Sequence, residues 1–370
     1  VQNNGIYKWH SLSVEDYFSL AGRTDHDEYE KVNGVLDVWF DSSGIQDMNN
    51  NKNADLYVEG SDQHRGWFSS SLLKGILTDN IPFKTVLTHG FVVDDSNFKM
   101  SKSGKNGMSP KDILKRYNSD VLRLWVASVD YTNDISMRDD ILKNVSSLYD
   151  KIRNPFRYMT GILLNYPVKD KVTTTDIHSS IVEEFNELTN QFNSSMNNYD
   201  ISKSVKLLRE FLEYLSSTYF DIHKDLLYCQ KGDDEWNSYR SVIMYLYSGL
   251  TNLVKPILPS LVNELYETVK PMNVEVNIVS APWVKSFLLE TKKKIKEMTS
   301  EKTDTLVLEM VVDHSISEDK LKRWFMVSDV IKSDKWFLSN TTKHKCSRCW
   351  RYDSITDEIC DRCKNVIGDY

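Results

Sequence analysis

The sequence predicts a multidomain protein in which an α/β part is followed by an all-α helical bundle and a small C-terminal zinc ribbon. Three observations support this prediction. Short apolar runs alternate with a helical pattern before about residue 108. Apolar residues then recur at every third or fourth position from about residue 138 to 270, and four cysteines lie within the last 25 residues. A chain of 370 residues is long enough for two or three domains of about 150 residues each.

The α/β part is expected to contain buried strands at residues 35–40, 55–59 and 85–88. Residues 65–77, between the second and third strands, carry apolar side chains at helical spacing. Strands that alternate with helices favour a parallel sheet. Residues 109–112 (Ser-Pro-Lys-Asp) then mark a helix start, with serine as the N-cap, proline first and an acidic residue in the first turn.

Two apolar stripes at helical spacing predict the bundle, and their aromatic and methionine side chains are interpreted as core. The first stripe contains Ile181, Phe185, Leu188, Phe192, Met196 and Tyr199, and the second contains Val205, Leu208, Leu212, Leu215, Tyr219 and Ile222. Further along, residues 305–312 are expected to form a strand, and the lysines of residues 292–296 are interpreted as a solvated helix face.

The composition excludes several classes of protein. Hydrophobic residues make up 40% and charged residues 27%, so disorder is not expected. No apolar stretch approaches the roughly 18 to 20 residues that cross a bilayer, and no secretory signal is visible, so we expect neither a membrane nor an exported protein. The net charge of 46 − 53 = −7 means that nucleic-acid contact would need local basic surfaces. Because the sequence opens with Val1, we expect that the natural N-terminus is missing.

The clustered cysteines predict a metal site in a reducing compartment. Two Cys-x-x-Cys pairs, Cys346 with Cys349 and Cys360 with Cys363, supply four thiolates for one tetrahedral structural Zn²⁺. Four ligands leave no open position, so this metal would organise the ribbon and not catalyse. The alternative is four buried or redox-active cysteines. Basic residues around the ribbon fit either a solvated face or phosphate contact: Lys343, Lys345, Arg348, Arg351, Arg362 and Lys364.

Two further motifs are suited to a nucleotide. Lys99 and Lys102 lie three residues apart in a Lys-Met-Ser-Lys-Ser loop, where both could reach a polyphosphate, although a generic loop remains open. The run Glu59-Gly-Ser-Asp-Gln-His-Arg-Gly-Trp-Phe68 follows a predicted strand, and ligands of α/β sheets bind at such ends. The alternative for this run is an N-capped helix.

Four segments, taken in their order along the chain, resemble the C-terminal part of a class I aminoacyl-tRNA synthetase. They are Leu36-Asp-Val-Trp-Phe-Asp-Ser42, the run at residues 59–68, His89-Gly-Phe91 and the lysine loop. Two of these segments, the run at residues 59–68 and Trp-Phe-Asp-Ser, are similar to the isoleucyl-tRNA synthetases in particular. The terminal Cys-x-x-Cys-Trp is similar to the bacterial-type form of these enzymes. The resemblance covers the chain from about residue 30 to the end.

The resemblance implies an ATP- and Mg²⁺-dependent ligase that activates isoleucine and transfers it to its tRNA, in a cytoplasmic, monomeric enzyme. It implies that Lys99 and Lys102 are catalytic, with Lys102 binding ATP. It also implies that the adenylate site is lined by Glu59, Gly60, Asp62 and Gln63, and that Trp39 and Trp67 flank the isoleucine side chain. His89 is expected near the active site, with no proton-transfer role assigned.

The implied domains follow the same order. They are the C-terminal half of a Rossmann-type catalytic domain with the lysine loop (1–108), a linking helical region (109–165), an anticodon-binding bundle (166–289), and a C-terminal junction (290–370) whose zinc ribbon (343–367) contacts tRNA.

The sequence departs from the family pattern in three ways. Gly44 and Gly104 are each displaced by one position, which puts the local backbone path in doubt. No His-x-Gly-His signature occurs, and losing one such transition-state contact typically costs about 10²–10³ in rate, so the 370 residues alone are expected to form little or no adenylate. The alternative is a stand-alone, non-catalytic tRNA-binding protein, against which the retained Lys99 and Lys102 argue. Three single residues are interpreted structurally: Cys229 as buried, and His10 and His178 as surface residues.

Overall fold

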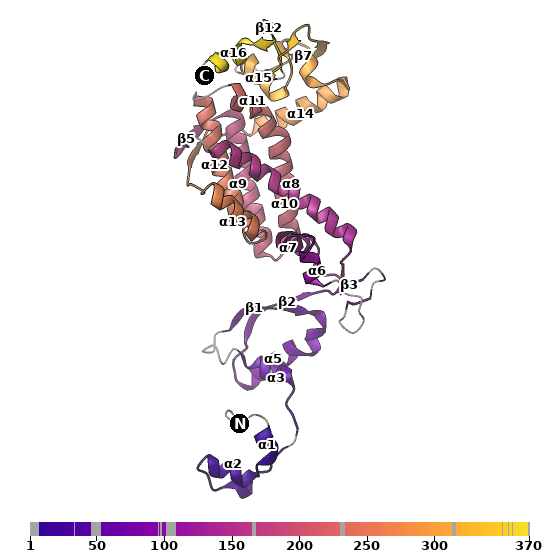
Figure 1. The fold of residues 1–370 in the computed structure, drawn as a ribbon, viewed down its shortest axis with the longest axis vertical. Helices are drawn as coiled ribbons and strands as arrows, with labels where there is room; N and C mark the ends of the chain where they lie inside the picture. The colour runs from indigo at the N-terminus through magenta and orange to yellow at the C-terminus, as the bar shows by residue number, and fades with distance from the viewer. Residues whose placement is uncertain are drawn as a thin grey trace. The chain divides into compact units, whose positions relative to one another are not determined.

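The computed structural model describes residues 7–32, 34–45, 53–94, 96, 98–100, 109–164, 168–229, 234–312, 316–349, 351–353, 355–356 and 358–368. The chain divides into two compact units, Val1–Phe91 and Val92–Tyr370 (Figure 1). Among the described residues, no helix combines the length and the apolar character that crossing a bilayer requires.

A parallel pair of strands forms the centre of the first unit. Strand β1 (Ala54–Gly60) pairs with β2 (Phe83–His89) in parallel, and α5 (Trp67–Leu77) connects them. The predicted strands at residues 55–59 and 85–88, and their parallel arrangement, are therefore confirmed. The other elements of this unit are α1 (Tyr7–Ser11), α2 (Val14–Leu20), η1 (His26–Glu28), α3 (Val38–Ser43) and η2 (Ser61–Arg65).

The buried strand predicted at residues 35–40 is wrong. Helix α3 begins at Val38 because the Asp37 carboxylate caps it, accepting a hydrogen bond from the backbone N–H of Trp39 at 2.7 Å. The apolar run is also not buried, since Val35 is 96% and Val38 70% exposed. An apolar run alone does not distinguish a strand from a short helix, and here the capping aspartate decides the outcome.

The second unit opens with a short strand and two capped helices. Strand β3 (Val92–Val93) pairs in parallel with β4 (Ile135–Ser136). Helix α6 (Pro110–Leu114) begins as predicted, because the Ser109 hydroxyl accepts a hydrogen bond from the N–H of Lys111 at 3.3 Å. Helix α7 (Ser119–Ser128) follows it.

The predicted helical bundle is confirmed (Figure 1). Its helices share one hydrophobic core. The two predicted stripes lie mainly on α9 and α10 and are buried except at the end of the first. There Met196 is half-buried and Tyr199, which lies beyond α9, is 37% exposed, so the prediction that Tyr199 belongs to the core is wrong. A π-helical turn, η3, continues α10 into α11, and the parallel pair β5–β6 packs beside α12. The elements are α8 (Asp139–Leu163), β5 (Lys171–Thr174), α9 (Asp176–Asn197), α10 (Ile201–Tyr214), η3 (Leu215–Phe220), α11 (Asp221–Cys229), α12 (Asp234–Val254), α13 (Pro259–Thr268) and β6 (Glu275–Ile278).

The prediction that His178 is a surface residue is wrong. His178 is 8% exposed, and its Nδ1 lies 2.7 Å from the hydroxyl of Tyr219. The residue stands three and four positions before Ile181 and Val182, on the inward face of α9. His223, whose ring stacks on that of His178, is also buried. His10 is exposed, as predicted, and the side chain of Cys229 lies outside the described residues.

A small sheet and a cysteine-rich ribbon follow the bundle. The sheet has the order β8-β7-β9, and the predicted strand at residues 305–312 is β7, whose alternate residues Leu306, Leu308 and Met310 are buried. The elements are α14 (Trp283–Met298), η4 (Thr303–Thr305), β7 (Leu306–Met310), α15 (Glu318–Phe325), β8 (Asp329–Lys332), β9 (Phe337–Asn340), β10 (His344–Lys345), β11 (Tyr352–Asp353), β12 (Ile355–Thr356), β13 (Ile359–Cys360) and α16 (Asp361–Gly368).

Candidate functional site

The carboxyl ends of β1 and β2 bring two of the singled-out motifs together in the first unit. Gly60 pairs with His89, and Glu59 with Thr88, so the runs that follow the two strands start at the same sheet edge. Glu59 is exposed there, whereas Gly60 is buried. A Cβ at Gly60 would lie 2.8 Å from Asp62 Oδ1 and 3.2 Å from the Phe91 ring, so only glycine fits this position without displacing a neighbour.

The polar residues after β1 form the 3₁₀ turn η2, which precedes α5. The Gln63 side-chain oxygen accepts a hydrogen bond from the backbone N–H of Trp67 at 3.1 Å, and its amide donates to Asp62 at 3.4 Å. Gly60 and Gly66, which precede this turn and α5, have no side chain that could cap them, so the N-capped-helix alternative is not what the structure shows. Asp62 is exposed beside the sheet edge, where a ligand can reach it. The roles of Gly60, Asp62 and Gln63 toward an adenylate stay predictions.

The two tryptophans assigned to an amino-acid pocket both lie beside Gly66. A Cβ at Gly66 would lie 3.0 Å from the Trp39 ring, which is itself 40% exposed. Trp67 stacks on Tyr57, with ring centroids 4.3 Å apart and planes within 4°. The indole N–H of Trp67 is buried and has no hydrogen-bond partner within the described part of the chain. The helix start therefore gathers an apolar, aromatic surface next to the polar sheet edge.

His89 has a defined tautomer. Its Nδ1 lies 2.8 Å from the carbonyl oxygen of Gly90. A carbonyl oxygen only accepts, so Nδ1 donates there and Nε2 of the neutral ring is left as an acceptor. This ring can thus accept a hydrogen bond from a ligand hydroxyl at the sheet edge.

The lysine loop belongs to the second unit. Lys99 is exposed and forms an antiparallel bridge with Val93, and the N–H of Met100 donates to the carbonyl of Val92 at 2.9 Å. The short strand β3 therefore fixes the backbone at the first lysine. Lys102 and Gly104 lie outside the described residues. The other displaced glycine, Gly44, ends α3 with right-handed helical backbone angles, which any residue adopts.

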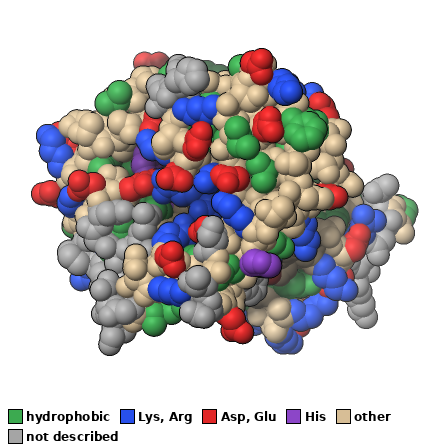
Figure 2. Space-filling view, turned by 90° about the horizontal axis from the view of Figure 1, so that it is seen from above, with side chains coloured by type: hydrophobic (Ala, Val, Ile, Leu, Met, Phe, Trp, Pro, Cys, Tyr) green, Lys and Arg blue, Asp and Glu red, His purple; other side chains and the backbone are tan. Residues whose placement is uncertain are grey.

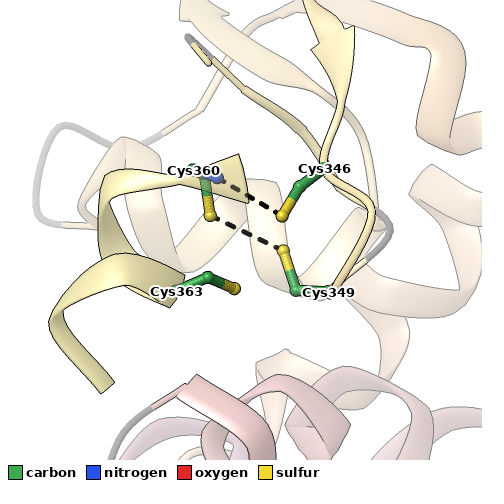
Figure 3. Close-up of side chains that lie close together, drawn as sticks. All are labelled: Cys346, Cys349, Cys360 and Cys363. Atoms are coloured by element: carbon green, nitrogen blue, oxygen red, sulfur yellow. Dashed lines mark hydrogen bonds between the residues drawn. The ribbon is translucent and has the colours of Figure 1, made fainter. Parts of the chain in front are cut away.

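The four cysteines of the ribbon come together (Figure 3). Their sulfur atoms all lie within 4.8 Å of one another, and Cys349 Sγ is 3.7 Å from Cys360 Sγ. Tetrahedral zinc with Zn–S bonds of about 2.3 Å separates its sulfurs by about 3.8 Å, whereas a disulfide joins them at about 2.05 Å. The separations fit a shared metal ion and not disulfides, and the cysteines are free.

The surroundings of the cysteines combine burial with nearby N–H donors. Burial raises the pKa of the Cys360 thiol to about 12. Burial acts in the same direction on Cys346, but backbone N–H groups, including those of Cys349 and Cys360, outweigh it and lower the pKa of that thiol. Arg362 Nη2 lies 3.6 Å from Cys349 Sγ. Desolvated sulfurs with N–H donors around them are compatible with a four-cysteine zinc site that has no open position.

Known families match both units. The family model of class I tRNA synthetases (I, L, M and V) matches residues 1–138, and that of the anticodon-binding domain of tRNA ligase matches residues 178–312. The fold is similar to that of LeuRS from Agrobacterium radiobacter, solved in a ternary complex with tRNA and LeuAMS (TM-score 0.53, 13% identity, 79% of this chain and 38% of that one). It is also similar to methionyl-tRNA synthetase from Mycobacterium tuberculosis, solved with methionyl-adenylate (TM-score 0.51, 17% identity, 69% and 48%).

The chain belongs to the class I aminoacyl-tRNA synthetases. Within that class its sequence is similar along nearly its whole length to isoleucine–tRNA ligases. It is 34% identical to the enzyme of Sulfurovum sp. over 99% of this chain and 45% of that protein, and 34% identical to that of Xylella fastidiosa over 100% and 44%. The resemblance predicted from the motifs is thereby confirmed, and the chain spans less than half the length of these relatives.

Proposed function

We propose that this chain acts as the C-terminal part of an isoleucine–tRNA ligase, which activates isoleucine with ATP and then transfers it to tRNA. The similarity to isoleucine–tRNA ligases over 99% of the chain carries this proposal. The parallel strand edge with Gly60 and His89, the lysine loop and the matched anticodon-binding region support it. No observation favours the stand-alone RNA-binding alternative.

The proposed chemistry has two steps. The isoleucine carboxylate attacks the α-phosphorus of ATP, forming isoleucyl-adenylate as pyrophosphate leaves. A hydroxyl of the terminal tRNA ribose then attacks the acyl carbon and AMP leaves. Lys99 and Lys102 would stabilise the negative charge that develops on the phosphates, where Mg²⁺ accompanies the substrate ATP. A fixed cation at such a position is worth several kcal/mol in the transition state, typically about 10²–10³ in rate.

Substrate recognition would be divided between the polar and aromatic parts of the first unit. Glu59, Gly60, Asp62 and Gln63 would line the adenylate, consistent with their place at the sheet edge. Trp39 and Trp67 would flank the isoleucine side chain, consistent with the aromatic surface beside Gly66.

The remaining regions would serve the tRNA. We assign residues 1–108 to the catalytic domain, 109–165 to the linking region, 166–289 to anticodon binding and 290–370 to the junction and ribbon. A structural Zn²⁺ held by the four cysteines would fix the ribbon's fold. The whole enzyme would be cytoplasmic and monomeric.

Reconstitution tests the proposal. The chain alone should show little isoleucine-dependent ATP–pyrophosphate exchange. Mixed with the part of the Sulfurovum ligase that precedes the matched segment, it should raise exchange above either part alone, and Lys102→Ala should reduce that gain at least about a hundredfold. The chain should also bind isoleucine tRNA more tightly than a non-cognate tRNA. Strong exchange by the chain alone, or equal binding of both tRNAs, would count against the proposal.

A further inference from the structure

One of the four ribbon cysteines can be reached from outside the ribbon. Cys346, Cys360 and Cys363 are fully buried, whereas Cys349 is only half-buried. Cys349 also lines a cavity of about 510 Å³ between the end of the bundle, α15 and the ribbon, and the other three cysteines do not line it. We call this space the ribbon cavity. It is far larger than the roughly 30 Å³ that one water molecule occupies, so a small polar molecule can enter it and reach Cys349.

Hydrogen-bond donors lie beside Cys349. Figure 2 views the end of the second unit at which the ribbon lies in Figure 1, and it shows Lys and Arg side chains around a hollow. Arg348 and Arg351 line the ribbon cavity together with Cys349, and Arg362 Nη2 lies 3.6 Å from the Cys349 sulfur. Each guanidinium carries five N–H donors. A small molecule with oxygen acceptors would therefore find donors next to this sulfur.

The Cys349 sulfur faces a second sulfur across the ribbon. Cys349 Sγ lies 3.7 Å from Cys360 Sγ, although the two residues belong to different Cys-x-x-Cys pairs (Figure 3). Two hydrogen bonds hold the pairs together. The N–H of Ser347 donates to the carbonyl of Glu358 at 3.0 Å, and the N–H of Cys360 donates to Cys346 Sγ at 3.3 Å. Because a disulfide joins its sulfurs at about 2.05 Å, Cys349 and Cys360 need only a small approach to form one.

We propose that Cys349 and Cys360 form a peroxide-sensitive disulfide, whose formation releases the zinc of the ribbon. A sulfur that binds zinc is a thiolate, which is the nucleophilic form of cysteine. The Cys349 thiolate attacks one oxygen of hydrogen peroxide, so the O–O bond breaks, a sulfenic acid forms and hydroxide leaves. The Cys360 thiolate then attacks the Cys349 sulfur, so the S–S bond forms, the S–O bond breaks and a second hydroxide leaves.

The reaction conserves electrons and leaves the metal with too few ligands. The two thiolates lose two electrons, and the peroxide gains them and becomes two hydroxide ions, which take up protons from the solvent. Only the thiolates of Cys346 and Cys363 then remain, whereas structural zinc requires four ligands. A thiol reductant reverses the disulfide by exchange, so zinc can bind again. This inference rests on the zinc site and not on the ligase reaction, which uses no redox step.

The test uses the full chain loaded with zinc and treated with stoichiometric hydrogen peroxide. Zinc release is followed with a chromogenic chelator, and disulfides are located by mass spectrometry after the remaining thiols have been alkylated. We expect zinc release to accompany a disulfide between Cys349 and Cys360. Addition of dithiothreitol and Zn²⁺ should then restore both the thiols and the bound zinc.

Matched variants separate attack at Cys349 from general oxidation. Cys349→His removes the reachable sulfur but keeps a ligand, because three cysteines and one histidine also form structural zinc sites. This variant should hold zinc and release it about tenfold or more slowly under peroxide. Cys363→His makes the same change at a buried cysteine and should release zinc at close to the wild-type rate. In Cys360→His the second sulfur is missing, so the sulfenic acid should persist at Cys349 and be trapped by dimedone.

Several results would overturn the inference. A disulfide between Cys346 and Cys349 in place of the expected one would contradict the assigned partners. Equal release rates for Cys349→His and Cys363→His would show that Cys349 is not the site of attack. Zinc that stays bound while all four cysteines stay reduced would show that the ribbon does not sense peroxide. If a histidine variant holds no zinc, the disulfide located in the wild-type chain decides.

The outcome for the ribbon is separate from the outcome for the ligase. A wild-type chain that contains no zinc before peroxide is added would contradict both the zinc site and this inference. The proposed ligase function is measured by pyrophosphate exchange and tRNA binding in reduced protein, so it stands or falls independently of the peroxide experiment.

Discussion

The buried histidines of the bundle link its stability to pH at the level of single residues. His178 Nδ1 lies 2.7 Å from the Tyr219 hydroxyl, and His223 Nδ1 donates to the carbonyl of Tyr219 at 2.7 Å. Their rings stack 4.9 Å apart. Burial lowers the pKa of His178 to about 4, assisted by the charge of Lys320, and it lowers the pKa of His223 well below its usual range. Both rings are therefore neutral in the folded protein near pH 7.

Acid should weaken the bundle between pH 6.5 and 4. In the unfolded chain His178 takes up a proton near pH 6.5, whereas the folded protein resists protonation until about pH 4. The unfolded state binds more protons in this window. The free energy of unfolding therefore decreases as the pH is lowered, by up to about 1.4 kcal/mol per pH unit for this residue. His178→Gln should lower stability at pH 7 and flatten this dependence, measured as urea midpoints from pH 7 to 4.5. His10→Gln, at an exposed position, should keep the wild-type slope, and parallel curves for wild type and His178→Gln would contradict the argument.

A second residue-scale prediction concerns a buried carboxylate. Asp120 on α7 is fully buried and accepts hydrogen bonds from the N–H groups of Ser260 at 3.3 Å and Leu261 at 2.8 Å, at the start of α13. Asp120→Ala leaves the buried N–H of Leu261 and the part-buried N–H of Ser260 without this acceptor, so it should lower the free energy of unfolding by about 1–3 kcal/mol in a denaturant titration. Asp112→Ala, which alters an exposed carboxylate on α6, should cost about 0.5 kcal/mol or less. Equal losses in the two variants would show that Asp120 does not act as a cap.

At the scale of elements, one glycine sets how closely α9 and α12 pack. A Cβ at Gly249 would lie 2.3 Å from Phe185 Cζ, and Phe185 is 4% exposed between Phe211 and Tyr245. Gly249→Ala should therefore destabilise the bundle by about 1–3 kcal/mol, although alanine is the better helix former by about 1 kcal/mol. Phe185→Leu removes the clashing ring edge, so the double variant should lose less stability than the sum of the single variants. If the double variant loses as much stability as the two single variants together, the clash of Gly249→Ala with the Phe185 ring is not the cause of its destabilisation.

The cysteine ribbon should depend on its metal while the bundle does not. Cys346, Cys360 and Cys363 form a small cluster of their own, separate from the main hydrophobic core. A region this small rarely folds without a metal or disulfides. Metal analysis should find about one zinc per chain, and Cys360→Ser should release it. A chelator should then expose the ribbon's amides to hydrogen exchange and leave those of α9 and α12 protected. Protein purified without chelators that contains no zinc would contradict the site.

The elements differ in how far the sequence could predict them. The stripes of α9 and α10 and the alternation in β7 were predictable because periodicity reports which side faces a core. The pairing of β5 with β6 joins residues 171–174 to residues 275–278, and no local pattern encodes it. The cysteine site was predictable from ligand spacing. The cavity that Lys224 and Arg323 share with residues of the ribbon was not predictable, because these residues come together only through folding.

At the scale of the whole molecule, the two units differ in how completely they bury apolar surface. The second unit has a continuous core, and the residues described for that core all follow Phe91. In the first unit, Val35 is 96%, Leu73 60% and Leu77 83% exposed. Exposed apolar groups in such number are typical of surfaces that contact another polypeptide. Stability measured on the chain should therefore report mainly on the second unit.

This difference predicts that residues 92–370 fold on their own. Expressed alone, they should unfold with the same denaturant midpoint as the full chain, bind the same amount of zinc, and bind less of the hydrophobic dye ANS, because the exposed apolar residues of the first unit are absent. Gly249→Ala should shift the midpoint equally in both chains, which verifies that the same core is being observed. If residues 92–370 melt at clearly lower denaturant than the full chain, the first unit stabilises the second and the two do not fold independently.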